Sequence, residues 1–145
     1  MLDDVYNTRI LELAADIPRL GRLAAPDGTA TARSKLCGST VTVDVKLSDG
    51  KVSDFAHDVK ACALGQASSS IMARQVIGAT SEELRAVRDL VRRMLKENGP
   101  PPPAEDRWSD IRVLEPVRDF KARHASTLLT FDAVVEAVEK AQAAQ

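Results

Sequence analysis

The sequence of 145 residues has few aromatic side chains, almost no net charge and no long apolar run. Aromatic residues make up 3% of the chain, and the formal net charge is -1 at pH 7. Without stacking side chains or excess cations, the composition argues against nucleic-acid binding. No run is long enough to cross a membrane, and the first residues lack the basic and apolar regions of a signal peptide. We therefore expect a cytoplasmic protein with neither a nucleic-acid nor a membrane partner.

Cysteine is also scarce, since the chain contains only Cys37 and Cys62. In a cytoplasmic protein, two cysteines are expected to stay reduced and available for metal or sulfur chemistry. With 44% hydrophobic and 28% charged residues of both signs, the chain has the composition of a globular protein. Its length predicts a single domain over residues 1–145.

Hydrophobic residues at helical spacing predict four amphipathic helices. The second of these follows Cys62, and the third begins with a Thr80–Glu83 capping box and ends near Asn98. A shorter helix, capped by Ser109, is expected to stop near Glu115 because Pro116 disfavours its continuation. The four prolines before it predict a stiff connector. The four amphipathic helices are predicted over 2–15, 63–77, 80–98 and 127–141.

A strand is predicted from Thr40, where valine and leucine alternate with polar residues at positions 41 to 47. Asp49-Gly50 is a strong hairpin signal, so residues 51–60 should return antiparallel beside that strand. A short edge strand is expected near 29–33. The sequence therefore predicts an α+β fold, with a small, mostly antiparallel sheet of about three strands and helices packed on one face.

The hairpin gives the two cysteines a common location. Cys37 just precedes the outgoing strand and Cys62 just follows the returning one, so both thiols should lie at the same end of the sheet. Cys62 also begins a helix, where unpaired N–H groups favour a thiolate, and we expect it to be the more reactive thiol. Two such cysteines form half of a metal site, with further ligands from elsewhere. The alternative is a buried cysteine that packs as a small hydrophobe.

Four blocks of the chain, in order, resemble one known family. They are Pro18-Arg19-Leu20-Gly21, Leu36-Cys37-Gly38-Ser39, the block from Ala61-Cys62-Ala63 to Ser70, and Leu114-Glu115-Pro116-Val117 with the residues to Arg123. Together they resemble the U-type iron-sulfur cluster scaffold family, which comprises IscU, SufU and the N-terminal domain of NifU. The resemblance covers nearly the whole chain and implies that Cys37 and Cys62 bind iron or an iron-sulfur cluster.

The sequence departs from the family at the ligand positions. A match without gaps puts Ser126 at the place of the third cysteine, and Ser39 replaces the aspartate of the Cys-Gly-Asp motif. A serine hydroxyl is a far poorer ligand for iron or zinc than a thiolate. Two further candidate metal ligands therefore accompany Cys37 and Cys62, namely Ser126 and His124. We expect His124 to face solvent and His57 to be structural.

The resemblance implies a scaffold or carrier of iron-sulfur clusters rather than an enzyme, working with a cysteine desulfurase and cluster-recipient proteins. Two alternatives stay open. The missing third cysteine favours a degenerate interaction protein that keeps the fold without durable metal binding. The proline-rich insertion resembles the SufU branch and favours a zinc-binding sulfur acceptor that takes persulfide sulfur from a cysteine desulfurase.

Overall fold

The computed structural model describes residues 6–36 and 38–145. Within these ranges, three strands form one antiparallel sheet of order β1-β2-β3. The strands are β1 (Gly28–Arg33), β2 (Thr40–Ser48) and β3 (Lys51–Lys60). All three predicted strands are confirmed.

Alternating side chains give β2 one apolar face. Val41, Val43 and Val45 are each 0% exposed, and they supply the sheet side of the core. Asp49 and Gly50 both have positive φ, at 53° and 76°, which is the geometry of a tight two-residue hairpin turn. The hairpin prediction at these two residues is therefore confirmed.

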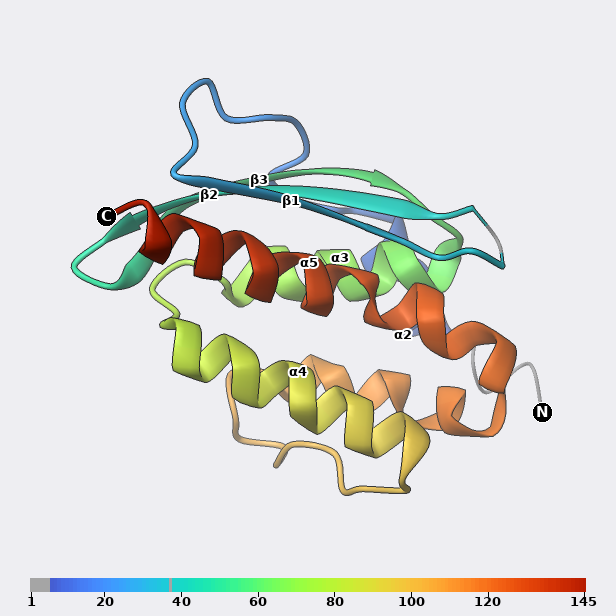
Figure 1. Ribbon diagram of the computed structural model, residues 1–145. Helices are drawn as coiled ribbons and strands as arrows, with labels where there is room; N and C mark the ends of the chain where they lie inside the picture. Colours follow the sequence, from blue (N-terminus) through green and yellow to red (C-terminus); the bar gives the residue numbers. More distant parts are fainter. Residues whose placement is uncertain (1–5, 37) are drawn as a thin grey trace.

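The helices pack against this apolar face of the sheet. Figure 1 shows α3 and α5 directly beneath the sheet, with α4 and η1 in a further layer below them. This arrangement confirms the predicted α+β fold. None of the helices in the described part of the chain is long and apolar enough to cross a membrane. The α-helices are α2 (Thr8–Ala15), α3 (Ala63–Gln75), α4 (Ser81–Lys96) and α5 (His124–Ala143), and the 3-10 helices are η1 (Ser109–Asp119) and η2 (Lys121–Arg123).

The loop between α2 and β1 covers the other face of the sheet (Figure 1). It is anchored by Asp44, which points away from the helices and is nevertheless 0% exposed. Its carboxylate accepts hydrogen bonds from Arg22 Nε at 2.7 Å, from Thr29 Oγ1 at 2.6 Å and from the backbone N–H of Leu23 at 3.0 Å. Burial raises the pKa of Asp44, but these hydrogen bonds and the Arg22 charge outweigh it and lower the pKa below 3.8.

The first helix is shorter than the sequence predicts. Helix α2 begins at Thr8, and the Asn7 side chain caps it by accepting a hydrogen bond from Ile10 N at 2.9 Å. An asparagine at this position satisfies a free N–H group at the helix start and so fixes the boundary there. The predicted helix from Leu2 is therefore wrong at Tyr6 and Asn7, and its first residues lie outside the described part.

The short helix after the connector differs in type and length from the prediction. It is a 3-10 helix that continues through Pro116 to Asp119 instead of stopping near Glu115. Proline removes one N–H donor, but its fixed φ suits a 3-10 helix. Ser109 is the first residue of η1 rather than its cap.

Glu83 of helix α4 binds the end of the proline-rich connector by hydrogen bonds. Thr80 Oγ1 accepts a hydrogen bond from Glu83 N at 3.2 Å, which confirms one half of the predicted capping box. The Glu83 carboxylate instead accepts from Trp108 Nε1 and from Arg107 Nε, both at 2.8 Å. Pro102 is buried. The end of the connector is therefore held to α4 through Arg107 and Trp108.

Candidate functional site

Cys62 lies between β3 and α3, as the sequence predicts. It is the N-cap residue of α3, with an extended backbone at φ -68° and ψ 174°. Gln66 holds this turn, because its backbone N–H donates to the Cys62 carbonyl and its side chain donates to the Ala61 carbonyl, both at 2.9 Å. The Gln66 side chain had no predicted role, since only a structure shows which carbonyl it reaches.

Cys62 lies at the positive end of the α3 helix dipole. The first N–H groups of α3 point toward its start, and the first turn contains no acidic residue. The thiol is half-buried. A partly accessible sulfur at a helix N-terminus can act as a nucleophile or as a metal ligand.

Ser126 faces Cys62 from the first turn of α5. Its Oγ lies 3.5 Å from Cys62 Sγ, and the residue is 3% exposed. The thiol donates to the Ser126 hydroxyl, which in turn donates to the Arg123 carbonyl at 3.2 Å. The position predicted for a missing third cysteine is thus directly beside the second cysteine.

Gly65 allows the two helices to come this close. A Cβ atom at Gly65 would lie 3.2 Å from the Ser126 carbonyl oxygen and 2.6 Å from Ala61 Cβ. The absence of a side chain at Gly65 therefore permits the close approach of α3 and α5. The predicted terminal helix starts three residues early, at His124, so that Ser126 lies within the first turn.

His124 is buried rather than facing solvent, so the expectation of an exposed side chain is wrong. It is 5% exposed, and its Nε2 lies 3.1 Å from the carbonyl oxygens of Val117 and Arg118. Because carbonyls only accept, Nε2 carries the proton, and only Nδ1 of the neutral ring could bind a metal. The backbone carbonyls at the end of η1 thus fix the orientation of the ring.

His57 has a structural position, as expected. It is 0% exposed, and its Nε2 donates to the Pro18 carbonyl at 2.9 Å. Its backbone also pairs with the loop, accepting from Gly21 N at 2.8 Å and donating to the Arg19 carbonyl at 3.2 Å. Burial lowers the pKa of His57 and keeps the ring neutral, although the Pro18 carbonyl and Asp58 act in the opposite direction. His57 therefore holds the loop to the edge of β3.

The remaining predicted ligand, Cys37, lies outside the described residues. The ends of the hairpin do meet, because Thr40 pairs with Lys60. Ser39, at the position of the family aspartate, is 5% exposed. In residues 6–36 and 38–145, no three side chains of His, Cys, Asp or Glu come together as a metal site. The proximity of the two cysteines stays a prediction.

A family model and two named relatives assign this chain to related families. The family model described as NifU-like N terminal domain matches residues 5–127. A relative from Streptococcus pyogenes, "Iron-sulfur cluster assembly scaffold protein IscU", is 31% identical over 109 residues, which are 75% of this chain and 67% of the relative. A protein of the same name from Thermotoga maritima is 25% identical over 94% of both chains.

Solved structures share the fold. A NifU-like protein (N-terminal) from Brucella abortus is 65% identical, with a TM-score of 0.94 over 98% of this chain and 97% of that one. A putative scaffold protein for the SUF system from Fervidobacterium islandicum is 20% identical, with a TM-score of 0.84 over 94% of this chain and 98% of that one. Because the family model spans most of the chain, from the first helix to the start of α5, this protein belongs to the NifU-like N-terminal domain family.

Proposed function

We propose that this protein is a scaffold on which an iron-sulfur cluster is assembled or carried, with Cys37 and Cys62 as thiolate ligands. The cluster is cargo that is later passed on. The observation that carries the proposal is the place of Cys62, a half-buried thiol at the N-terminus of α3 and beside the first turn of α5. The relatives named as iron-sulfur cluster assembly scaffold proteins support it.

The ligands at this site suit temporary binding of an iron-sulfur cluster. Thiolates are preferred ligands of iron-sulfur clusters, whereas the hydroxyl of Ser126 binds iron or zinc poorly. A cluster held by two thiolates has positions left for ligands from a partner or from a second copy of the chain. We infer that this protein retains its cargo less tightly than a scaffold with three cysteines.

The partners in this proposal are a cysteine desulfurase, which supplies sulfur, and proteins that receive the cluster. We propose that the protein acts in the cytoplasm.

The surroundings of Cys62 also favour a second function, in which the protein accepts sulfur. For that function one accessible thiolate suffices, because it attacks the desulfurase persulfide, takes its outer sulfur and releases the desulfurase thiolate. Zinc at the site would fit this second function.

Anaerobic reconstitution tests the proposal. The chain is incubated with ferrous iron, sulfide and a thiol reductant, and iron, zinc and sulfide are measured beside the visible absorption spectrum. We expect iron and sulfide in equal amounts with charge-transfer absorption, and we expect Cys62→Ala to lose both. Zinc without sulfide would favour the sulfur acceptor. Failure to retain any metal would favour the degenerate interaction protein.

A further inference from the structure

A polar cavity lies beside the first turn of α5. It has a volume of about 510 Å³ and lies between the C-terminal end of α4, the end of η1, and η2. His124 contributes to its wall, whereas Ser126, two residues later, faces Cys62. The cavity is therefore separate from the thiol site. It is lined by Leu95, Lys96, Asn98, Arg118, Asp119, Lys121 and His124.

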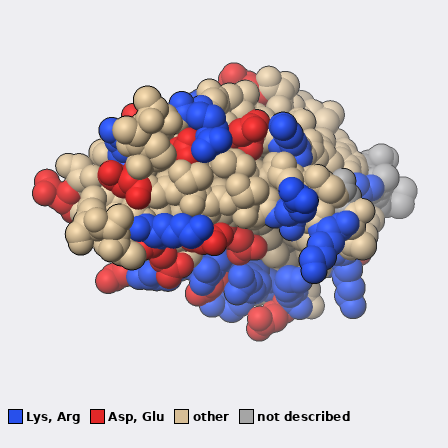
Figure 2. All heavy atoms as spheres, turned by 45° about the horizontal axis from the view of Figure 1, so that its top comes forward, with Lys and Arg blue, Asp and Glu red and all other residues tan. Residues whose placement is uncertain are grey.

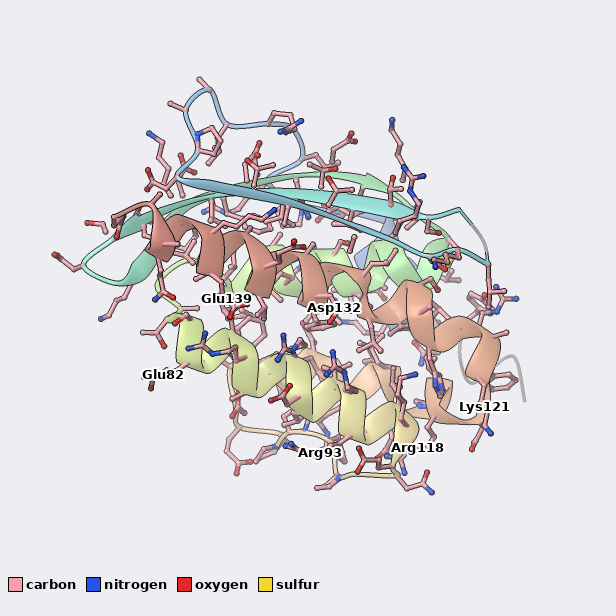
Figure 3. All side chains as sticks on the ribbon, in the orientation of Figure 1. Glu82, Arg93, Arg118, Lys121, Asp132 and Glu139 are labelled. Carbon is pink, nitrogen blue, oxygen red and sulfur yellow. The ribbon has the colours of Figure 1, made fainter. Side chains whose placement is uncertain are left out.

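Cationic side chains dominate this lining. Lys96, Arg118 and Lys121 carry three positive charges against the single negative charge of Asp119. Figure 3 shows Arg118 and Lys121 at the same end of the molecule, where η1 and η2 lead into α5. In the space-filling view, Lys and Arg side chains lie along the lower part of the molecule, with Asp and Glu side chains among them (Figure 2). The cavity is thus a local basic site in a chain with a net charge of -1.

Asp119 lies in the lining and Asp132 interacts electrostatically with Lys96, but neither forms a close ion pair with the two lysines. Within the described residues, no carboxylate lies within 4.0 Å of the ammonium groups of Lys96 or Lys121. Arg118 is partly compensated, because its Nη2 donates to the Gly99 carbonyl at 2.9 Å and to Glu115 Oε2 at 3.1 Å. These bonds fix the guanidinium at the wall of the cavity. Two lysine ammonium groups and one fixed guanidinium suit a ligand with more than one negative charge.

We propose that this cavity binds an oxyanion of the phosphate type, either free phosphate or the phosphate group of a larger ester. A doubly charged oxyanion can accept hydrogen bonds from both lysines and from the amide of Asn98. The volume lies in the range of small-molecule pockets and leaves room beyond a single phosphate. The proposal goes beyond the scaffold function and uses neither cysteine.

Titration of the metal-free full chain tests this site. Inorganic phosphate and ADP are titrated by calorimetry and followed by amide chemical shifts, with adenosine as the ligand that lacks phosphate. We expect saturable binding of phosphate or ADP, no binding of adenosine, and shifts centred on Lys121 and His124. The affinity should fall at least tenfold in K96Q/K121Q. The affinity should also weaken as salt is added.

Lys140→Gln is the matched control, because Lys140 is an exposed lysine on α5 that pairs with Glu136 outside the cavity. Tighter binding of ADP than of phosphate would identify an ester as the ligand, and the reverse would identify free phosphate. No saturable binding, or equal affinity of K96Q/K121Q and the natural chain, would overturn the proposal. Equal losses in K96Q/K121Q and Lys140→Gln would also overturn it. Cys62→Ala should bind the anion normally, which separates this test from the test of the scaffold.

Discussion

Cys62 Sγ and Ser126 Oγ lie 3.5 Å apart, although 64 positions separate the two residues in the sequence. This contact joins the start of α3 to the first turn of α5. It puts the Ser126 hydroxyl beside the Cys62 thiol. The resemblance to three-cysteine scaffolds leads one to expect the third cysteine at this place. A hydroxyl at this place is a weaker ligand than the thiolate that the resemblance leads one to expect.

The reactivity of the two thiols provides the first prediction. Because the N–H groups at the start of α3 favour negative charge, we expect Cys62 to be alkylated faster than Cys37 at the same pH. The measurement is iodoacetamide labelling over time, followed by mass spectrometry of the two cysteine peptides. Equal and slow labelling of both would contradict a reactive thiolate at Cys62.

Gly65→Ala tests the close contact of α3 with α5. In an open helix this change would stabilise the protein by about 1 kcal/mol. Here the new Cβ atom would lie 2.6 Å from Ala61 Cβ and 3.2 Å from the Ser126 carbonyl. We therefore expect a net loss of about 1–3 kcal/mol in the free energy of unfolding, measured with urea. A gain in stability would show that the helices can separate freely.

The sequence predicted most of the sheet because its signals there are local. Valines alternate along β2, and Asp49-Gly50 fits the positive φ values of the turn. The helix ends were less predictable. The boundary at Asn7 and the 3-10 geometry through Pro116 depend on competing hydrogen bonds and on packing, which hydrophobic spacing does not report.

The candidate site was predicted in part. The position of Cys62 follows from the hairpin and the helix after it, and alignment identified Ser126. The burial of His124 was missed, because the carbonyls that hold its ring come from η1, a helix whose end was predicted wrongly. The anchoring role of Asp44 was also missed, since alternation alone puts it on a solvent face.

Asp44→Asn tests the anchor of the loop over the sheet. Because its pKa is lower in the folded protein than the ordinary value of 3.8, Asp44 stabilises the fold above that pH. This contribution is lost as the pH falls through the lowered pKa. We expect Asp44→Asn to cost about 2–3 kcal/mol at pH 7, and the difference from the natural chain to shrink toward pH 2. Urea unfolding across this range measures it, and a constant difference would contradict the account.

Glu83→Ala tests the attachment of the connector to α4. The change removes the acceptor of both Trp108 Nε1 and Arg107 Nε. We expect a red shift of the fluorescence of Trp108, the only tryptophan in the chain, and a loss of about 1–3 kcal/mol in the free energy of unfolding. Glu82→Ala is the control, because Glu82 is the exposed neighbour on the same turn. Identical spectra for both variants would contradict the proposed attachment.

We propose that Ser126 occupies the place of a metal ligand beside Cys62. Replacing Ser126 with cysteine, alone or together with Ser39→Asp, would restore the ligand types of the family. The thiol reductant must be present, because two thiols this close can also form a disulfide. Ala125→Cys is the matched control, since it adds a thiol at an exposed position of the same turn.

The decisive measurement is the amount of iron and sulfide that each variant retains after anaerobic reconstitution and gel filtration. We expect Ser126→Cys to retain more of both than the natural chain, and the double variant with Ser39→Asp to retain the most, because each added anionic ligand strengthens the site. Ala125→Cys should retain no more than the natural chain. Equal retention by the natural chain and both Ser126→Cys variants would contradict the claim that Ser126 stands at a ligand position.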